Sequence, residues 1–233
     1  YHANIHKALK YAVKLDLISS NPADKIERPK KERFMANFYD ADEVNRLFEI
    51  SKGTKLEIPI LFGAFYGMRR SETLGMKWDA IDFERDTITI RHTLTTVALD
   101  GKRITVAEDR TKNKSSMRTL PLVPFVKERL LELKAEQEEN RRLCGRSYVK
   151  DYTGYVCINE IGDIIKPNYV SCGFPKLLEE HGLRRVRYHD LRHSCASLLL
   201  ANGVPMKQIQ EWLGHSDFST TANIYAHLEY SSK

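Results

Sequence analysis

Two features are missing from this chain of 233 residues: a long apolar stretch and closely paired cysteines. The longest apolar run, Ile58 to Tyr66, is far shorter than the roughly 20 residues needed to cross a membrane. The four cysteines form no C-x-x-C pair, so we expect reduced thiols rather than a zinc ribbon or a disulfide framework. The first residues are charged and do not have the apolar core of a signal peptide, so we expect a cytoplasmic protein without membrane contact.

Positive charge exceeds negative charge, with a formal net charge of +6. This excess favours a polyanionic partner, although many basic proteins bind no nucleic acid. The charge is uneven: one basic cluster comprises Lys25, Arg28, Lys30, Lys31 and Arg33. A second cluster ends at Arg187. Each cluster alone is also what an ordinary solvated surface carries.

The pattern along the chain predicts three parts. Apolar residues at helical spacing predict a helix over residues 3–18, ended by Ser20, Asn21 and Pro22. A basic, proline-containing stretch follows, with the composition of a linker. We therefore expect a helical segment at 1–24, a linker at 25–38 and a main domain at 39–233. A lone helix cannot bury its apolar face, and the chain opens inside a helical pattern without a methionine, so we expect that a missing N-terminal domain completes it.

The main domain is predicted to be α+β, mainly α-helical, with one small antiparallel β-sheet. Asp40 and Glu43 have the spacing of a capping box and predict a helix that runs to about Ser51. Further helices are predicted at 56–66, 70–74, 123–143, 167–180, 190–202, 205–213 and 219–228. Strands are predicted at 87–94, 102–107 and 116–120, with a polar turn before the last of them.

The string HDLRHS places His189 and Arg192 three residues apart near a predicted helix N-terminus. At this spacing the two side chains share a helix face, and the free N–H groups of the terminus suit a phosphate. A histidine and an arginine there can hold the oxygens of one phosphate. A surface arginine beside a helix-capping polar residue is an alternative interpretation of the same motif.

A metal site is the competing interpretation, because His189 and His193 have the i, i+4 spacing of metal ligands. Arg192 lies between them, and no glutamate follows the first histidine. A cation beside a metal ion is unfavourable, so we expect no metal at this position.

Two other segments have polar residues that suit catalysis. In GMRRSE, Gly67 ends a helix, Arg69 begins the next, and Glu72 can hold an arginine by a charge-assisted hydrogen bond. In STTANIYAHL, Tyr225 lies near the end of the sequence. Taken singly, the first segment is explained by a surface salt bridge and the tyrosine by core packing.

Together, GMRRSE, TKN, HDLRH, LGHSD and TTANIYAH occur in this order between about residues 38 and 228. This succession resembles the tyrosine recombinase family, the phage-type integrases, and in general character the integrases of conjugative transposons. The resemblance implies a catalytic set of Arg69, Lys112, His189, Arg192, His215 and the nucleophile Tyr225, supported by Glu72. The resemblance places the first catalytic arginine at Arg69 rather than at the neighbouring Arg70, and the catalytic lysine at Lys112 rather than at Lys114.

The resemblance also implies the chemistry. Tyr225 attacks a DNA phosphate held by Arg69 and Arg192, and a 3′-phosphotyrosine stores the bond energy. His189 is the implied base, His215 a hydrogen-bond donor to the phosphate, and Lys112 the acid that protonates the 5′-hydroxyl leaving group. No ATP, metal or other cofactor is needed.

Partners follow from the same resemblance. We expect double-stranded DNA at element ends and target sites, a homotetramer in the synaptic complex, and accessory DNA-bending or excision factors at the bacterial nucleoid. Residues 1–24 resemble the last helix of a core-binding domain, and the basic cluster at Lys25 to Arg33 then contacts DNA. Three alternatives remain: a type IB topoisomerase, a non-catalytic DNA-binding protein on the same fold, and a zinc hydrolase.

Overall fold

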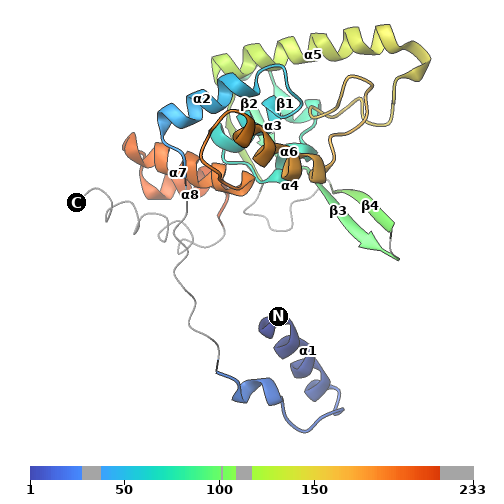
Figure 1. The fold of residues 1–233 in the computed structure, drawn as a ribbon, viewed down its shortest axis with the longest axis vertical. Coiled ribbons are helices and arrows are strands. Elements are labelled where there is room, and N and C mark those ends of the chain that lie inside the picture. Colours follow the sequence, from blue (N-terminus) through green and yellow to red (C-terminus); the bar gives the residue numbers. More distant parts are fainter. Residues whose placement is uncertain (28–37, 101, 109–116, 216–233) are drawn as a thin grey trace. The chain divides into compact units, whose positions relative to one another are not determined.

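The structure, a computed structural model, describes residues 1–27, 38–100, 102–108 and 117–215. The chain divides into two compact units, Tyr1–Met35 and Ala36–Lys233 (Figure 1). The division falls within the predicted linker 25–38, most of which lies outside the described residues. Whether the first unit is part of a core-binding domain stays a prediction.

The first unit contains helix α1 (His2–Lys14) and the short 3₁₀-helix η1 (Pro22–Lys25). The prediction that the helix continues to residue 18 is wrong, because Asp16 adopts a left-handed φ of 56° that an α-helix cannot continue. η1 contacts α1 through a side-chain hydrogen bond, in which Nε2 of His6 lies 2.6 Å from Oδ1 of Asp24. Ile5 and Tyr11 of α1 remain exposed, so this unit leaves apolar surface uncovered.

The second unit is mainly helical with small antiparallel sheets, which confirms the predicted fold class. Its helices are α2 (Ala41–Ser51), α3 (Glu57–Phe65), α4 (Arg70–Gly75), α5 (Pro124–Cys144), α6 (Pro167–Glu180), α7 (Leu191–Ala201) and α8 (Met206–Leu213). Among the described residues, the 3₁₀-helices η2 (Trp78–Ala80), η4 (Gly145–Ser147) and η5 (Tyr188–Asp190) lie between them. Each of these α-helices begins and ends within one residue of its predicted bounds. The helix predicted at 219–228 lies outside the described residues, and no helix in the described ranges is long and apolar enough to span a membrane.

Helix α2 begins as its sequence predicts. The side chain of Asp40 accepts a hydrogen bond from the backbone N–H of Glu43 at 2.8 Å, and Glu43 accepts one from the backbone N–H of Asp40 at 3.0 Å. This capping box satisfies two N–H groups that a helix start otherwise leaves unpaired.

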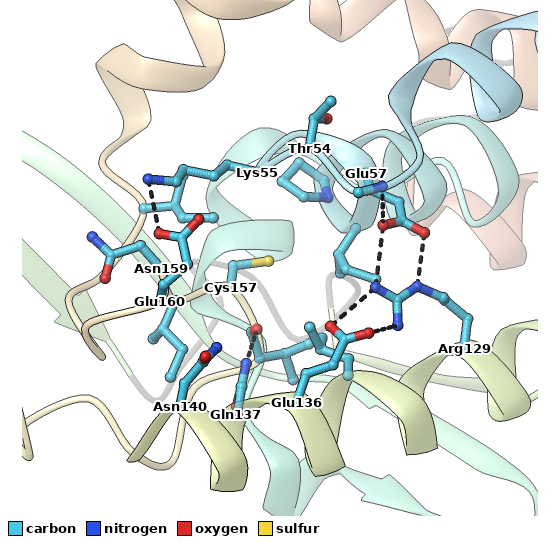
Figure 2. Close-up of a pocket in the computed structure, with 17 residues that line it drawn as sticks. Thr54, Lys55, Glu57, Arg129, Glu136, Gln137, Asn140, Cys157, Asn159 and Glu160 are labelled. Atoms are coloured by element: carbon cyan, nitrogen blue, oxygen red, sulfur yellow. Dashed lines mark hydrogen bonds and ion pairs between the residues drawn. The ribbon is translucent and has the colours of Figure 1, made fainter. Parts of the chain in front are cut away.

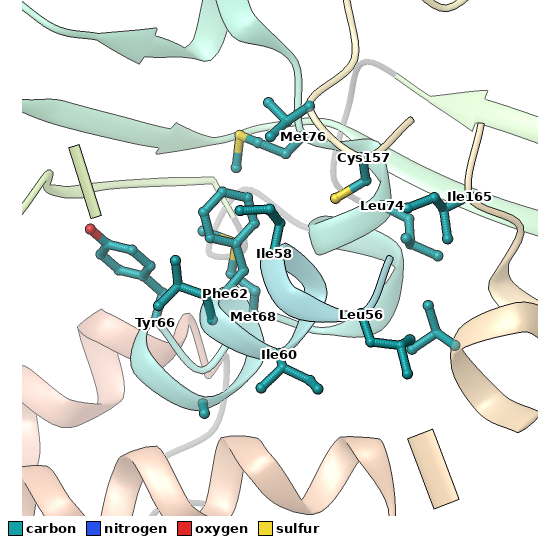
Figure 3. Close-up of a cluster of buried hydrophobic side chains, with 14 of the residues drawn as sticks. Leu56, Ile58, Ile60, Phe62, Tyr66, Met68, Leu74, Met76, Cys157 and Ile165 are labelled. Carbon is teal, nitrogen blue, oxygen red and sulfur yellow. The ribbon is translucent and has the colours of Figure 1, made fainter. Parts of the chain in front are cut away.

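The core of the second unit surrounds α3, in which every residue from Ile58 to Ala64 is buried. Figure 3 shows the side chains of Leu74 and Met76, after the start of α4, and of Cys157 and Ile165 gathered around this helix. An apolar run of this length is therefore a central core helix. Its last turn leads directly into the segment that carries Arg69.

The strands form two sheets, whereas one was predicted. β1 (Ile81–Asp82), β2 (Thr87–Ile90) and β5 (Arg118–Pro121) form a three-stranded antiparallel sheet, and β3 (Thr93–Leu99) and β4 (Lys102–Glu108) form a separate ribbon (Figure 1). The predicted strand at 87–94 is thus two strands, with Arg91 and His92 between them. Oδ1 of Asp79 lies 3.1 Å from Arg91 Nη2 and 3.4 Å from His92 Nε2 at this break.

Candidate active site

Arg69 and Glu72 form an ion pair at the start of α4. Oε1 of Glu72 lies 2.6 Å from Nη1 of Arg69, and Oε2 accepts the backbone N–H of Arg69 at 3.0 Å. The side chain of Glu72 is 2% exposed and that of Arg69 is 35% exposed. Burial raises the pKa of the Glu72 carboxyl, but Arg118 and Arg69 outweigh it and hold that pKa below its usual value. Glu72 is therefore an ionised anchor that leaves the Arg69 guanidinium open to solvent.

A second buried arginine, which the sequence interpretation missed, contacts the same carboxylate. Nη2 of Arg118 lies 3.1 Å from Oε2 of Glu72, and its Nε donates to the carbonyl oxygen of Trp212 at 2.6 Å. Arg118 opens strand β5 on the side that also buries Leu120. That alternation was the available signal, because an arginine on the core face of a strand requires a buried acceptor.

Arg192 of α7 is 2% exposed and donates to three protein acceptors. Its Nη1 contacts the carbonyl oxygen of Gly67 at 2.7 Å, its Nη2 that of Leu213 at 2.5 Å, and its Nε lies 3.1 Å from Nε2 of His215. Gly67 has a φ of 62°, which permits the tight turn between α3 and Arg69. Arg192 therefore ties together three segments that are distant in the sequence.

His215 reaches Arg192 because α8 ends in a left-handed glycine. Gly214 has a φ of 67°, and the backbone N–H of His215 returns to the carbonyl oxygen of Gln210 at 3.1 Å. A guanidinium only donates, so Nε2 of His215 is the acceptor and the imidazole proton resides on Nδ1. Burial, with Arg192 and Arg69 nearby, lowers the pKa of His215 to about 3.

His189 lies in η5, immediately before α7. Partial burial, His193 and Arg192 lower the pKa of His189, although part of its ring is exposed. Its ring meets that of His193 edge to face, with centroids 5.8 Å apart. The turn is fixed by Asp190, whose carboxylate accepts the backbone N–H of Arg187 at 2.8 Å.

The structure therefore brings together five of the residues singled out from the sequence. These are Arg69, Glu72, His189, Arg192 and His215. Lys112 and Tyr225 lie outside the described residues, as do Arg28, Lys30, Lys31 and Arg33 of the basic cluster. Lys25 is described, and it is exposed at the end of η1. The catalytic and DNA-binding roles of all these residues stay predictions.

A pocket of about 320 Å³ lies elsewhere, between the start of α3, helix α5 and the segment around Cys157 (Figure 2). Its one arginine, Arg129, is engaged by Glu57 at 2.7 Å and by Glu136 at 3.0 Å. Its lysine, Lys55, lies 2.9 Å from Glu160, so both cations are neutralised and the pocket does not suit a phosphate. Within the described part of the chain, no three His, Cys, Asp or Glu side chains are arranged to hold a metal ion.

The chain belongs to the phage integrase family, whose model matches residues 37–232. It is 32% identical over 217 residues to a tyrosine recombinase XerC-like protein of Caldanaerobacter subterraneus, with 91% of this chain and 54% of the relative aligned. It is 30% identical over 228 residues to tyrosine recombinase XerC of Pediococcus pentosaceus, covering 94% of this chain and 67% of that protein. The chain thus spans between about half and two thirds of these relatives.

Solved structures share the fold. The Tn1549 transposon integrase in complex with transposon right end DNA superimposes with a TM-score of 0.77 at 20% identity, over 99% of this chain and 75% of the integrase. XerA recombinase superimposes with a TM-score of 0.63 at 21% identity, over 97% and 72% of the two chains. The resemblance found in the sequence is confirmed at the level of family and fold.

Proposed function

We propose that this chain is the catalytic part of a site-specific DNA recombinase that cleaves and rejoins strands through a 3′-phosphotyrosine at Tyr225, for excision and integration of a mobile element. One observation carries the proposal. In a chain of the phage integrase family, the guanidinium groups of Arg69, Arg118 and Arg192 lie near the buried carboxylate of Glu72, and His215 contacts Arg192. Such a cationic cluster suits a phosphodiester whose charge grows during attack.

The two arginines differ in what they can do. The side chain of Arg69 is 35% exposed, so its guanidinium can receive phosphate oxygens directly. Arg192 is 2% exposed and already donates to Gly67 and Leu213, so it offers the phosphate only its remaining N–H groups. Arg69 is therefore the primary anion ligand in this proposal, and Arg192 holds the site together and adds charge.

Proton transfers complete the reaction. The tyrosine hydroxyl, with an unperturbed pKa of about 10, must lose its proton during attack. His189 is the proposed base, and its lowered pKa keeps the imidazole neutral at physiological pH. His215, with its proton on Nδ1, can donate a hydrogen bond to a phosphate oxygen while Arg192 holds Nε2. Lys112 is the proposed acid for the 5′-hydroxyl.

The wider assembly is also proposed. Residues 1–24 form the end of a core-binding domain, residues 25–38 a basic linker on the duplex, and residues 39–233 the catalytic domain. The basic side chains of the linker contact phosphates, so binding weakens steeply with salt. Four protomers act on two duplexes, assisted by DNA-bending or excision factors, in the cytoplasm at the bacterial nucleoid.

Covalent trapping tests the function. The chain is incubated with a pool of duplexes of random sequence, each nicked so that the cleaved fragment diffuses away and the adduct accumulates. Denaturing electrophoresis and peptide mapping then locate the attached DNA. We expect an adduct on the peptide containing Tyr225, absent in Tyr225→Phe and retained in the matched control Tyr230→Phe.

DNA binding is measured for the same variants. Tyr225→Phe should bind like the parent, because one hydroxyl contributes little beside many phosphate contacts. A parent chain that binds DNA and forms no adduct supports a non-catalytic role on this fold. An adduct that forms in Tyr225→Phe at the parent rate shows that the nucleophile is another residue.

A further inference from the structure

Arg118 contacts two parts of the candidate site: the Arg69–Glu72 ion pair and the end of α8. On one side its Nη2 lies 3.1 Å from Oε2 of Glu72, the carboxylate that also holds Arg69. On the other side its Nε donates at 2.6 Å to the carbonyl oxygen of Trp212, in the last turn of α8. The side chains of Arg118 and Glu72 are 6% and 2% exposed, so this connection is inside the protein.

The end of α8 is held by two arginines at consecutive carbonyl groups. Arg118 contacts the carbonyl oxygen of Trp212, and Arg192 contacts that of Leu213 at 2.5 Å. The last carbonyl groups of a helix have no partner within the helix and carry its negative dipole end, so cations suit them. Two residues further along is His215, which Arg192 also contacts. The pair of arginines therefore fixes where the chain leaves α8.

The buried ion pair of Arg118 is costly. Burial lowers the pKa of the Arg118 guanidinium, and Glu72 restores only part of the loss. A buried ion pair often stabilises a fold no better than apolar side chains of the same volume. The geometry that the pair imposes therefore explains its presence better than stability does.

We propose that Arg118 is a positioning residue for strand cleavage, which fixes the Arg69–Glu72 pair relative to the end of α8 and hence to His215. This inference rests on the proposed function. In the proposed function Arg69 receives the phosphate and His215 donates a hydrogen bond to it, so Arg118 sets how these two groups are aligned. A misalignment of about 1 Å between reacting groups lowers a rate by about 100-fold.

Arg118 also lies close in sequence to the proposed acid. It is six residues after Lys112 and is the first residue of β5, where it pairs with Ile90 of β2. The strand that follows the lysine is thus anchored by the guanidinium that anchors Arg69. The side chain of Arg118 therefore holds three parts of the site in place: the arginine that precedes α4, the end of α8 and the start of β5.

The test compares Arg118→Met, Arg118→Lys and a matched control, Arg129→Met. Arg129 is also a partly buried arginine in a carboxylate pair, with Glu57 at 2.7 Å, but it lines the separate pocket in Figure 2. Single-turnover adduct formation is measured at saturating nicked duplex, normalised to folded protein, together with DNA affinity. We expect Arg118→Met to bind DNA like the parent and to cleave about 100-fold more slowly. Arg118→Lys, which can keep one contact, should cleave at a rate between those of Arg118→Met and the parent. Arg129→Met should cleave like the parent.

A second readout needs no activity. The backbone N–H of Gly214 donates to the carbonyl oxygen of Glu211 and that of His215 to Gln210, so amide hydrogen exchange at Gly214 and His215 in the DNA-free protein should be faster in Arg118→Met than in the parent and in Arg129→Met. Parent-like cleavage by folded Arg118→Met, or unchanged hydrogen exchange at Gly214 and His215, overturns the inference. A parent that forms no adduct overturns the proposed function instead, and the hydrogen exchange still decides whether Arg118 holds the end of α8.

Discussion

Nε of Arg192 lies 3.1 Å from Nε2 of His215, and this contact makes the guanidinium and the imidazole one unit. The hydrogen bond exists only while His215 is neutral, because a protonated imidazole has no acceptor nitrogen. Protonation would place two cations in contact within a half-buried cluster. The folded chain therefore selects the neutral form of His215.

Acid pH should destabilise the fold through His215. Burial and the nearby arginines lower its pKa to about 3 in the folded state, whereas the unfolded chain protonates near the ordinary value of about 6.5. Between these values the unfolded state binds more protons, so stability is complete above about pH 6.5 and decreases as pH falls. At pH 5 we expect a loss of about 1 to 2 kcal/mol, discounted for partial exposure.

Urea denaturation at pH 7.5 and pH 5.0 measures this effect. In that range Glu72 stays ionised, since its pKa is below its usual value. His215→Gln should lose less stability than the parent on acidification. The lowered pKa of His189 leaves this variant a residual pH dependence of its stability. Equal losses in parent and variant would show that His215 is not held neutral.

Arg192→Lys should damage both stability and cleavage. An ammonium is a point charge that cannot reach the carbonyl oxygens of Gly67 and Leu213 together with His215. Buried acceptors left without a donor cost about 1 to 3 kcal/mol, and loss of a preorganised cation costs about 100-fold in rate. Urea denaturation and adduct formation are measured beside Arg91→Lys, an exposed ion-pair arginine that should behave like the parent.

Much of the second unit was predictable because local chemistry determines it. The helix from Pro167 to Glu180 has its predicted bounds, and the capping box of Asp40 forms as its spacing indicates. Glycine at positions 67 and 214 marks the turns that deliver Arg69 and His215, and both adopt the left-handed φ values that such turns need. Local signals therefore mark the turns before Arg69 and His215.

What escaped prediction depends on tertiary partners. No local pattern shows where the strand predicted at 87–94 is interrupted, because β2 pairs with β5 whereas β3 pairs with β4 in a separate sheet. The role of Arg118 requires Glu72 and Trp212, 46 and 94 residues away in sequence. Periodicity reports which side chains are buried but not which buried groups meet.

Arg69 and Arg70 provide a comparison of adjacent arginines. Arg69 turns to Glu72 in the site, whereas Arg70 contacts the hydroxyl of Ser171 on α6. We expect Arg69→Lys to bind DNA like the parent and form adduct about 100-fold more slowly, because one point charge cannot replace the planar fork. Arg70→Lys should change adduct formation by less than about 3-fold. The opposite ranking of the two variants would assign the phosphate to Arg70.

Asp40 tests the stability of the fold apart from the site. Asp40→Ala removes the hydrogen bond to the backbone N–H of Glu43 and should cost about 1 kcal/mol. Asp42→Ala is the control, since the exposed carboxylate of Asp42 contributes only about 0.3 kcal/mol to the free energy of unfolding through the helix dipole. Thermal or urea denaturation measures both, and adduct formation per folded molecule should be unchanged. A cleavage defect in Asp40→Ala would mean that α2 influences the site.

Lys112 and Lys114 can be separated by changing the leaving group. An oxygen leaving group needs a proton from the acid, whereas a sulfur at the 5′-bridging position leaves as a thiolate, whose conjugate acid has a pKa near 8.5 by comparison with cysteine. We expect Lys112→Ala to cleave an ordinary duplex about 100-fold more slowly than the parent and to cleave the sulfur-substituted duplex at nearly the parent rate. Lys114→Ala, two residues away, should match the parent on both substrates. If Lys114→Ala is the slow variant and sulfur substitution restores its rate, the acid is Lys114. If sulfur substitution does not restore the rate of the slow variant, the lysine acts on the phosphate and not on the leaving group.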